Sequence, residues 1–322
     1  HTWIMRNETA AALTLTQGTG ANVAIAAGQT KIVATDGAGS GAIVYEMDDL
    51  ELAGNLAVGG ELSTPSAGTS NTRIGVNAGN SIESGGNYNV VVGDEAGTAI
   101  TTGDNNTFVG YTAGDANTTA GNNTAVGYAS LTANTTGALN VAVGALALDA
   151  NQTGAANTAV GYNALSANTG DGATAVGKDA LELNTTGANT AVGANSLATV
   201  TSGTSNVAVG NDALTVNTAS NNTAVGASAL IANTTGDATT AVGKDSMKTN
   251  TTGRFNSALG YESLALNTTG ANNVALGKAA LYSNTTASNN TAVGHSALIA
   301  NTTGSNNTAV GFNAGDALTT GI

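Results

Sequence analysis

The chain has 322 residues and a formal net charge of −13, because 21 Asp and Glu outnumber 8 Lys and Arg. Charged residues make up 9% and aromatic residues 3%, while glycine occurs 44 times and cysteine is absent. The missing cysteine excludes disulfides and thiolate metal sites. The negative charge argues against nucleic acid as a partner, since phosphate binding needs clustered Lys and Arg. No stretch approaches the ~20 apolar residues of a membrane helix, so we expect no membrane insertion.

The first 47 residues contain short alternating runs separated by glycine-containing turns, which predicts a small antiparallel β module. The expected strands lie at 13–16, 23–25, 31–33 and 42–45. Residues 48–70, with the single proline at Pro65, are expected to form a shaft-like connector.

From residue 71 to residue 322 one glycine recurs every 16 to 18 residues, from Gly75 to Gly311. A fixed short period is typical of solenoids, in which each unit completes its core against its neighbours. The pattern therefore predicts an all-β fold, with a repetitive parallel β-roll or β-helix of about 15 coils after the N-terminal module.

Most units open with Asn-Thr-Ala-Val-Gly, and β-branched Thr and Val favour a strand. Because side chains alternate along a strand, we expect Thr and Val on one face and Asn, Ala and Gly on the other. The Val column is expected to be buried, at Val126, Val143 and Val160. The Asn column is expected to form a ladder of side-chain amides, at Asn123, Asn140 and Asn157.

Leu or Met stands four residues after the glycine in most units, and this column predicts a second strand that faces the core, at Leu131, Leu148 and Leu165. Glycine replaces it in the first three units and the last, where we expect narrower coils. One Val and one Leu per coil bury little surface against the backbone entropy of a whole coil. Other copies of the chain are therefore expected to pack against the small-residue face.

The Asn-Thr-Ala-Val-Gly units resemble the Asn-Ser-x-Ala-x-Gly repeats of trimeric autotransporter adhesin heads, and similar repeats occur in bacteriophage tail fibres. The adhesin heads are left-handed parallel β-rolls with shorter coils. The leader segments Trp3 to Asn7, Ile32 to Gly37 and Gly54 to Gly60 resemble tail-fibre shafts.

These resemblances imply a homotrimeric structural segment of a phage tail fibre, located on the virion tail and used in host attachment. Its partners would be two further copies of the chain, other tail proteins and a host cell-surface glycan or protein. A bacterial trimeric adhesin head on the cell surface is the alternative. An ice-binding β-solenoid that uses its Thr rows is a third.

The residue that follows each glycine is variable and mixes aromatics with cations, which predicts a stripe that contacts glycans. Its members are Tyr111, Tyr128, Tyr162, Lys178, Lys244, Tyr261 and Lys278. A simpler interpretation is that these side chains only cover neighbouring coils. Asp245 and Glu262 lie in one column of adjacent units, as a glycosidase pair would. The same column holds Asn, Thr, Ser and Ala elsewhere, so we expect a solvated face, no enzymatic activity, no cofactor and no metal.

Overall fold

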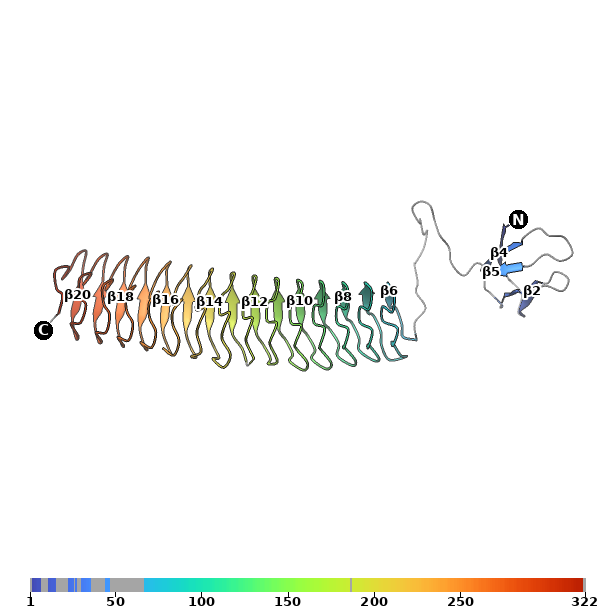
Figure 1. The fold of residues 1–322 in the computed structure, drawn as a ribbon, viewed down its shortest axis with the longest axis horizontal. Helices are drawn as coiled ribbons and strands as arrows, with labels where there is room; N and C mark the ends of the chain where they lie inside the picture. The colour runs from blue at the N-terminus through green and yellow to red at the C-terminus, as the bar shows by residue number, and fades with distance from the viewer. Residues whose placement is uncertain are drawn as a thin grey trace. The chain divides into compact units, whose positions relative to one another are not determined.

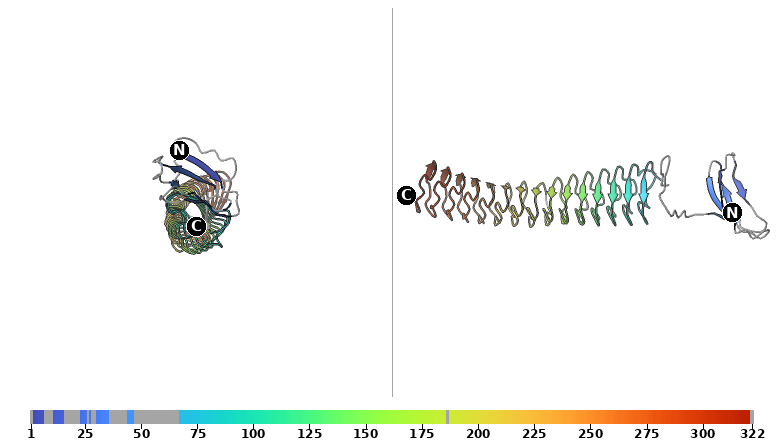
Figure 2. Two further views of the ribbon diagram at one scale, coloured as in Figure 1. Left: turned by 90° about the vertical axis from the view of Figure 1, so that its right-hand side faces the viewer. Right: turned by 90° about the horizontal axis from the view of Figure 1, so that it is seen from above.

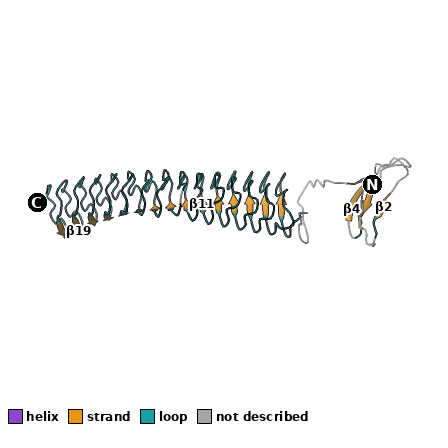
Figure 3. Cartoon of the chain, turned by 90° about the horizontal axis from the view of Figure 1, so that it is seen from below, coloured by secondary structure: helices purple, strands orange, loops and turns teal. Residues whose placement is uncertain are grey.

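The computed structural model describes residues 2–6, 11–15, 23–25, 27, 30–35, 44–46, 67–185 and 187–320. The chain divides into two compact units, His1–Leu62 and Ser63–Ile322. Within the described ranges, all helix or strand structure is β-strand (Figure 3). The predicted boundaries at residues 47 and 70 are not tested by this division and stay predictions.

Five strands are described in the first unit: Thr2–Arg6 (β1), Leu13–Leu15 (β2), Val23–Ile25 (β3), Thr30–Thr35 (β4) and Val44–Glu46 (β5). β4 pairs antiparallel with β1 and β5, and β2 pairs antiparallel with β3. The predicted turns at 18–20 and 36–37 and most of the predicted connector lie outside the described residues. That residues 1–47 form an independent module stays a prediction.

The second unit is a parallel β-solenoid whose fifteen strands form one sheet in chain order (Figure 1). The strands are Thr72–Ile74 (β6), Val90–Val92 (β7), Thr107–Val109 (β8), Thr124–Val126 (β9), Val141–Val143 (β10), Thr158–Val160 (β11), Thr174–Val176 (β12), Thr190–Val192 (β13), Val207–Val209 (β14), Thr223–Val225 (β15), Thr240–Val242 (β16), Ser257–Leu259 (β17), Val274–Leu276 (β18), Thr291–Val293 (β19) and Thr308–Val310 (β20). The first, second and third residues of each strand pair with the first, second and third residues of the next, so equivalent side chains stack along the solenoid. Seen end-on, successive coils overlay one another (Figure 2).

The middle residue of each strand, and not its flanking residues, faces the core. Ala125, Ala142 and Ala159 are completely buried, whereas the first and third residues of all fifteen strands are at least partly exposed. The prediction that the Val column is buried is therefore wrong for the single chain: Val126 is 36% exposed, and Val143 and Val160 are partly exposed. The coil is so narrow that its interior accepts Ala at this position, and the branched side chains point outward.

The wall opposite the sheet is built from turns, so the predicted second strand is wrong. The Leu column is fully buried, with Leu131, Leu148 and Leu165 at 0% exposure. These leucines have φ values of 53°, 52° and 54°, in the left-handed region that costs an L-residue roughly 1–2 kcal/mol. Burial in the core and the hydrogen bond from Leu131 N–H to the carbonyl of Ala147 (2.9 Å) in the next coil hold this conformation.

Large and small side chains exchange places across the core in the first coils. Gly97 and Gly114 occupy the Leu column, and the middle residues of β7 and β8 are the fully buried Val91 and Phe108. A Cβ added at Gly114 would lie 2.5 Å from the Phe108 ring. The volume removed from one wall is therefore supplied from the other.

In thirteen of the fifteen coils, the side chain of one asparagine lies at the junction with the next coil. Asn140 shows the pattern: its Oδ1 accepts from the N–H of Asn157 at 3.0 Å, and its Nδ2 donates to the carbonyl of Gly154 at 2.8 Å. Asn123 and Asn157 make the equivalent bonds. We call this arrangement the Asn staple. The oxygen and the nitrogen of the side-chain amide are thus both hydrogen-bonded inside the core, where an unpaired polar atom would cost stability.

The Nδ2 groups of Asn123, Asn140 and Asn157 do not donate to one another's side chains, although Asn106 Nδ2 donates to Asn89 Oδ1 at 3.1 Å in the same column. Most direct amide–amide hydrogen bonds lie in a different column, the Asn that begins the closing turn. Asn134 Nδ2 donates to Asn117 Oδ1 at 2.9 Å, and Asn151 Nδ2 donates to Asn134 Oδ1 at 3.1 Å. The ladder is interrupted after Asn151, whose Oδ1 is buried without a partner, and it runs again from Asn217 to Asn284. These turn asparagines are therefore part of the core.

Removing one Asn staple should destabilise the solenoid. Asn140→Ala leaves the buried N–H of Asn157 without its side-chain acceptor, at a cost of about 1–3 kcal/mol, while the Gly154 carbonyl keeps only the bond from Asn151 Nδ2. Thr239 interrupts the staple column, and its hydroxyl reaches the Gly253 carbonyl only at 3.5 Å. Thr239→Asn should therefore stabilise the protein. Denaturant unfolding of the parent and of both variants measures these two effects. Midpoints equal to that of the parent would contradict the role given to the Asn staple.

The size exchange predicts strong coupling between Phe108 and Gly114. Phe108→Ala opens a cavity and should cost about 3–5 kcal/mol, and Gly114→Leu alone overpacks the core against the ring. The double variant recreates the Ala and Leu arrangement of the later coils, so it should regain most of the lost stability. Additive losses in the free energy of unfolding would contradict the proposed exchange.

Candidate functional site

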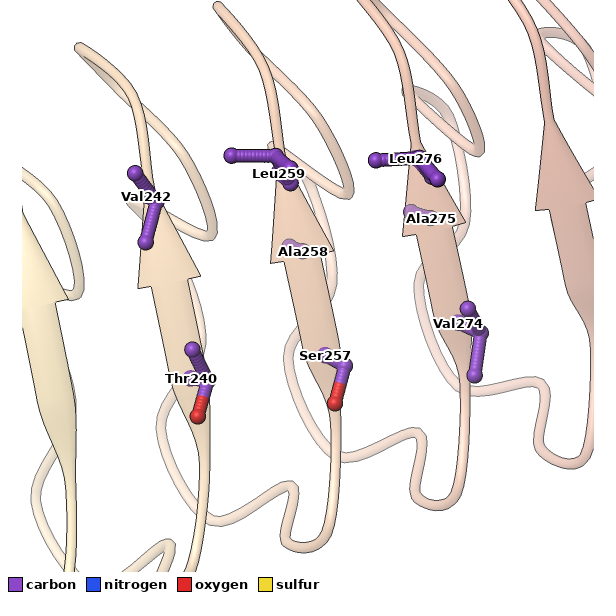
Figure 4. A pocket seen from close by; sticks show the side chains of 8 residues that line it. All are labelled: Thr240, Val242, Ser257, Ala258, Leu259, Val274, Ala275 and Leu276. Atoms are coloured by element: carbon purple, nitrogen blue, oxygen red, sulfur yellow. The ribbon is translucent and has the colours of Figure 1, made fainter.

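The first and third residues of strands β6 to β20 form a continuous face, which we call the outward face. The first position holds ten Thr, four Val and one Ser, and the third holds twelve Val, two Leu and one Ile. No charged side chain belongs to it. The two rows of side chains can be followed across three adjacent strands in Figure 4.

Side chains on the outward face are more exposed than apolar residues of a core. Val192 is 37% exposed, Leu276 41% and Leu259 48%. Neighbouring strands in a sheet lie ~4.8 Å apart and a three-residue strand spans roughly 10 Å, so the fifteen strands present about 700 Å² of uncharged surface. Eleven of the thirty side chains are Thr or Ser, so the apolar part lies within the range of the largest apolar patch on a typical monomer, roughly 300–600 Å².

A hollow of about 280 Å³ interrupts the outward face at β16 to β18. Its walls are Thr240, Val242, Ser257, Leu259, Val274 and Leu276, with Ala258 and Ala275 also lining it (Figure 4). In the picture, the short side chain of Ser257 belongs to the first-position row at β17, and the longer side chain of Leu259 belongs to the third-position row.

The predicted stripe of Tyr and Lys residues forms separate pairs on adjacent coils. Tyr111 and Tyr128 stack with their ring centroids 5.8 Å apart and their planes at 13°. The Lys278 ammonium lies 6.0 Å from the centroid of the Tyr261 ring. Tyr162 is 50% exposed. In the first ten coils the column is interrupted by Val76, Asp94, three alanines and an asparagine, so these pairs are separate there. In the last five coils it holds Lys244, Tyr261, Lys278, His295 and Phe312 without a break, and the His295 and Phe312 rings stack with their centroids 5.4 Å apart.

The other two lysines of the stripe contact the acidic residue that follows them. Lys178 forms an ion pair with Asp179, which raises the pKa of the Lys178 ammonium. Lys244 Nζ lies 3.7 Å from Asp245 Oδ2. Asp245 and Glu262, the residues considered as a catalytic pair, lie in left-handed turn positions of adjacent coils. Neither of them lines the hollow on the outward face.

Comparison with protein-family models, curated proteins and solved structures finds no match to this chain. In the described parts of the chain, no helix is long and apolar enough to cross a membrane. The functional interpretation therefore rests on the surface of the solenoid itself.

Sequence reasoning missed the outward face because it assigned the branched residues to the core. A signal for the correct orientation is present in the sequence. Val91 and Phe108 replace Ala in two of the four units where glycine replaces Leu, as expected if the Ala and Leu columns face each other.

One carboxylate in the turns predicts a pH effect on stability. Burial raises the pKa of Asp149, whose Oδ1 has no hydrogen-bond partner. The folded state therefore binds this proton more tightly than the unfolded state, and ionisation costs stability above the raised pKa. Asp149→Asn should raise the melting temperature at pH 7, and the gain should vanish as the pH falls below 3.8, the usual value.

The matched control is Asp316→Asn, which changes an exposed carboxylate in the last coil. It should leave the melting temperature unchanged at both pH values. A gain for Asp149→Asn that persists at low pH would contradict the assignment to the partly buried Asp149 carboxylate.

Proposed function

We propose that the solenoid is a structural segment of a homotrimeric phage tail fibre that serves in host attachment. The outward face carries this proposal, because it is uncharged, it contains an unbroken row of Val, Leu and Ile along all fifteen strands, and a lone chain leaves that row partly in water. Two further copies of the chain would cover it.

The size of the outward face supports self-association. Specific interfaces bury about 800 Å² on each partner. A ring of three divides the geometric area of this face, about 700 Å², between two neighbours, so each copy buries a comparable total area over its two contacts. Burial of the third-position Val side chains contributes a favourable term in every coil. Parallel copies around an axis would place equivalent strands at the same height, so the repeat of one chain matches the repeat of the next.

The number of copies and the viral setting are supported by the sequence resemblance to adhesin heads and tail fibres. In this setting the work of the segment is mechanical. Each coil is hydrogen-bonded to the next through the sheet, the turn wall and the Asn staple, so a stack about 70 Å long resists bending. It would hold a receptor-binding tip away from the particle, in contact with other tail proteins.

The Tyr and Lys pairs remain our proposal for contacts with a host glycan. Tyr111 and Tyr128 are both about half exposed, and an aromatic ring can pack against the apolar face of a sugar. The alternative setting, a bacterial adhesin head on the cell surface, uses the same outward face in the same way. The viral and bacterial settings differ in what adjoins this segment, a tail or a membrane anchor.

An ice-binding function is the second candidate, because the Thr side chains of the first strand position point outward in regular rows. That function needs the outward face to contact water, whereas a trimer buries it. Thermal hysteresis of the native assembly distinguishes the two functions: its presence would favour ice binding and contradict the buried face.

Charge placed on the outward face should separate the copies without unfolding them. The parent chain should sediment at three times its 31.0 kDa mass. Val192→Lys puts an unpaired charge into the interface, at a cost of several kcal/mol per copy, so the variant should sediment as a monomer with an unchanged circular dichroism spectrum.

The control is Tyr162→Lys, which places the same charge two residues after the third strand position and off the outward face. It should leave the trimer intact. A parent chain that sediments as a monomer at micromolar concentration would contradict the proposed assembly.

A further inference from the structure

The outward face is regular except at one place. Of its fifteen first-position residues only Ser257 is not β-branched, and of its fifteen third-position residues only Leu259 and Leu276 are not. All three lie on the adjacent strands β17 and β18, and all three line the hollow of about 280 Å³. The irregularities are therefore concentrated at one height of the stack.

A regular face creates a problem for assembly. One chain can slide past its neighbours by one coil and meet almost the same side chains, because Thr lies on Thr and Val on Val in successive coils. Only the contacts of the end coils are lost. Correct alignment of the copies therefore requires a feature that does not repeat.

Rotational symmetry determines which residues meet. In a closed ring of three, each interface is heterologous, so the first-position row of one copy faces the third-position row of the next. Without axial displacement, Leu259 of one copy lies at the height of Ser257 of its neighbour, since both belong to β17. Displaced by one coil, Leu259 would face Thr240 or Val274, which are β-branched.

Side-chain shapes fit the aligned arrangement. Leu259 is the more exposed of the two leucines at 48%, and its γ-branched side chain extends farther than Val. Ser257 lacks the γ-methyl of Thr, and its side chain lines the hollow (Figure 4). Forcing extra methyl groups into a packed contact is destabilising. If one copy of a closed ring slides by one coil, its two interfaces shift in opposite directions. Ser257 then meets Leu276 at one of them, but at the other it meets Val242 while Leu259 meets the β-branched Val274. Only the aligned trimer therefore places a leucine at Ser257 in all three interfaces.

We infer that Ser257, Leu259 and Leu276 fix the axial register of the copies, with Leu259 of one chain inserted at Ser257 of the next. This inference rests on the proposed homotrimer. It assigns to one short patch the alignment that the repeats themselves cannot specify.

Cysteine cross-linking can measure the register, because the chain has no cysteine of its own. One chain carries Thr174→Cys, at the first position of β12. Its partner carries either Val176→Cys, in the same strand, or Val192→Cys, one coil away in β13. The two chains are refolded together and oxidised, and the ratio of aligned to displaced cross-linked product is measured on a denaturing gel.

The decisive variant makes the face regular by Ser257→Thr, Leu259→Val and Leu276→Val. If the patch fixes the register, the ratio of aligned to displaced product falls by about tenfold or more, equivalent to about 1.4 kcal/mol. The matched control, Val90→Thr with Val141→Thr and Val207→Thr, makes three substitutions in the first-position row of the same face and keeps the β-branched shape. Its ratio should equal that of the parent.

A second measurement does not depend on cross-linking. Ser257→Thr alone adds one methyl group to the outward face and should lower the melting temperature of the trimer, and adding Leu259→Val should restore it. A trimer whose ratio is unchanged in the regular variant, or whose two substitutions act independently, overturns the register assignment alone. A parent chain that is monomeric in sedimentation overturns the proposed assembly and the register with it.

Discussion

The Asn staple is the interaction on which the solenoid depends. Each strand is only three residues long, and the opposite wall uses left-handed turns that cost an L-residue energy. A repeated side-chain amide that satisfies both an N–H and a carbonyl of the neighbouring coil compensates for these weaknesses, as at Asn140. Because each coil contacts only its neighbours, stability in such a stack is close to a sum over coils and their interfaces.

The narrow interior determines what the exterior must be. Ala, Asn and Leu fill the core, and the position between two inward residues is left to Thr or Val, which therefore point outward. The result is a chain whose folding is complete but whose surface includes a long apolar face. The same constraint links the repeat to assembly, because a face of identical coils favours association with copies that have the same spacing.

The period, the strands and the position of the glycine column could be predicted from the sequence. Each depends on local chemistry that recurs in every unit. The inward or outward direction of the strand could not be predicted from alternation alone, since Ala and Val are both apolar and the larger one was assigned to the core. The exchange of Phe108 with Gly114 contained the correct answer, but only when the two columns are compared with each other.

Other features have no local signal. Leucine disfavours a left-handed conformation, so its use at Leu131 follows from burial and from hydrogen bonds to the next coil. The pairing of Tyr111 with Tyr128 was predictable because they are equivalent residues of adjacent coils. The hollow at Ser257 was not, because its significance depends on which face of the strand meets another copy.

Amide hydrogen exchange tests the role of the Asn staple most directly. Ala173 and Thr239 replace the staple asparagine in two coils. In the next coils, the backbone N–H groups of Asn189 and Asn256 therefore have no side-chain acceptor within the described residues. Asn206 and Asn273 donate to Asn189 and Asn256 Oδ1 at 2.9 Å. We predict that the amides of Asn189 and Asn256 exchange about tenfold faster than those of Asn206 and Asn273. Equal protection at all four amides would contradict a stack held together by its asparagines.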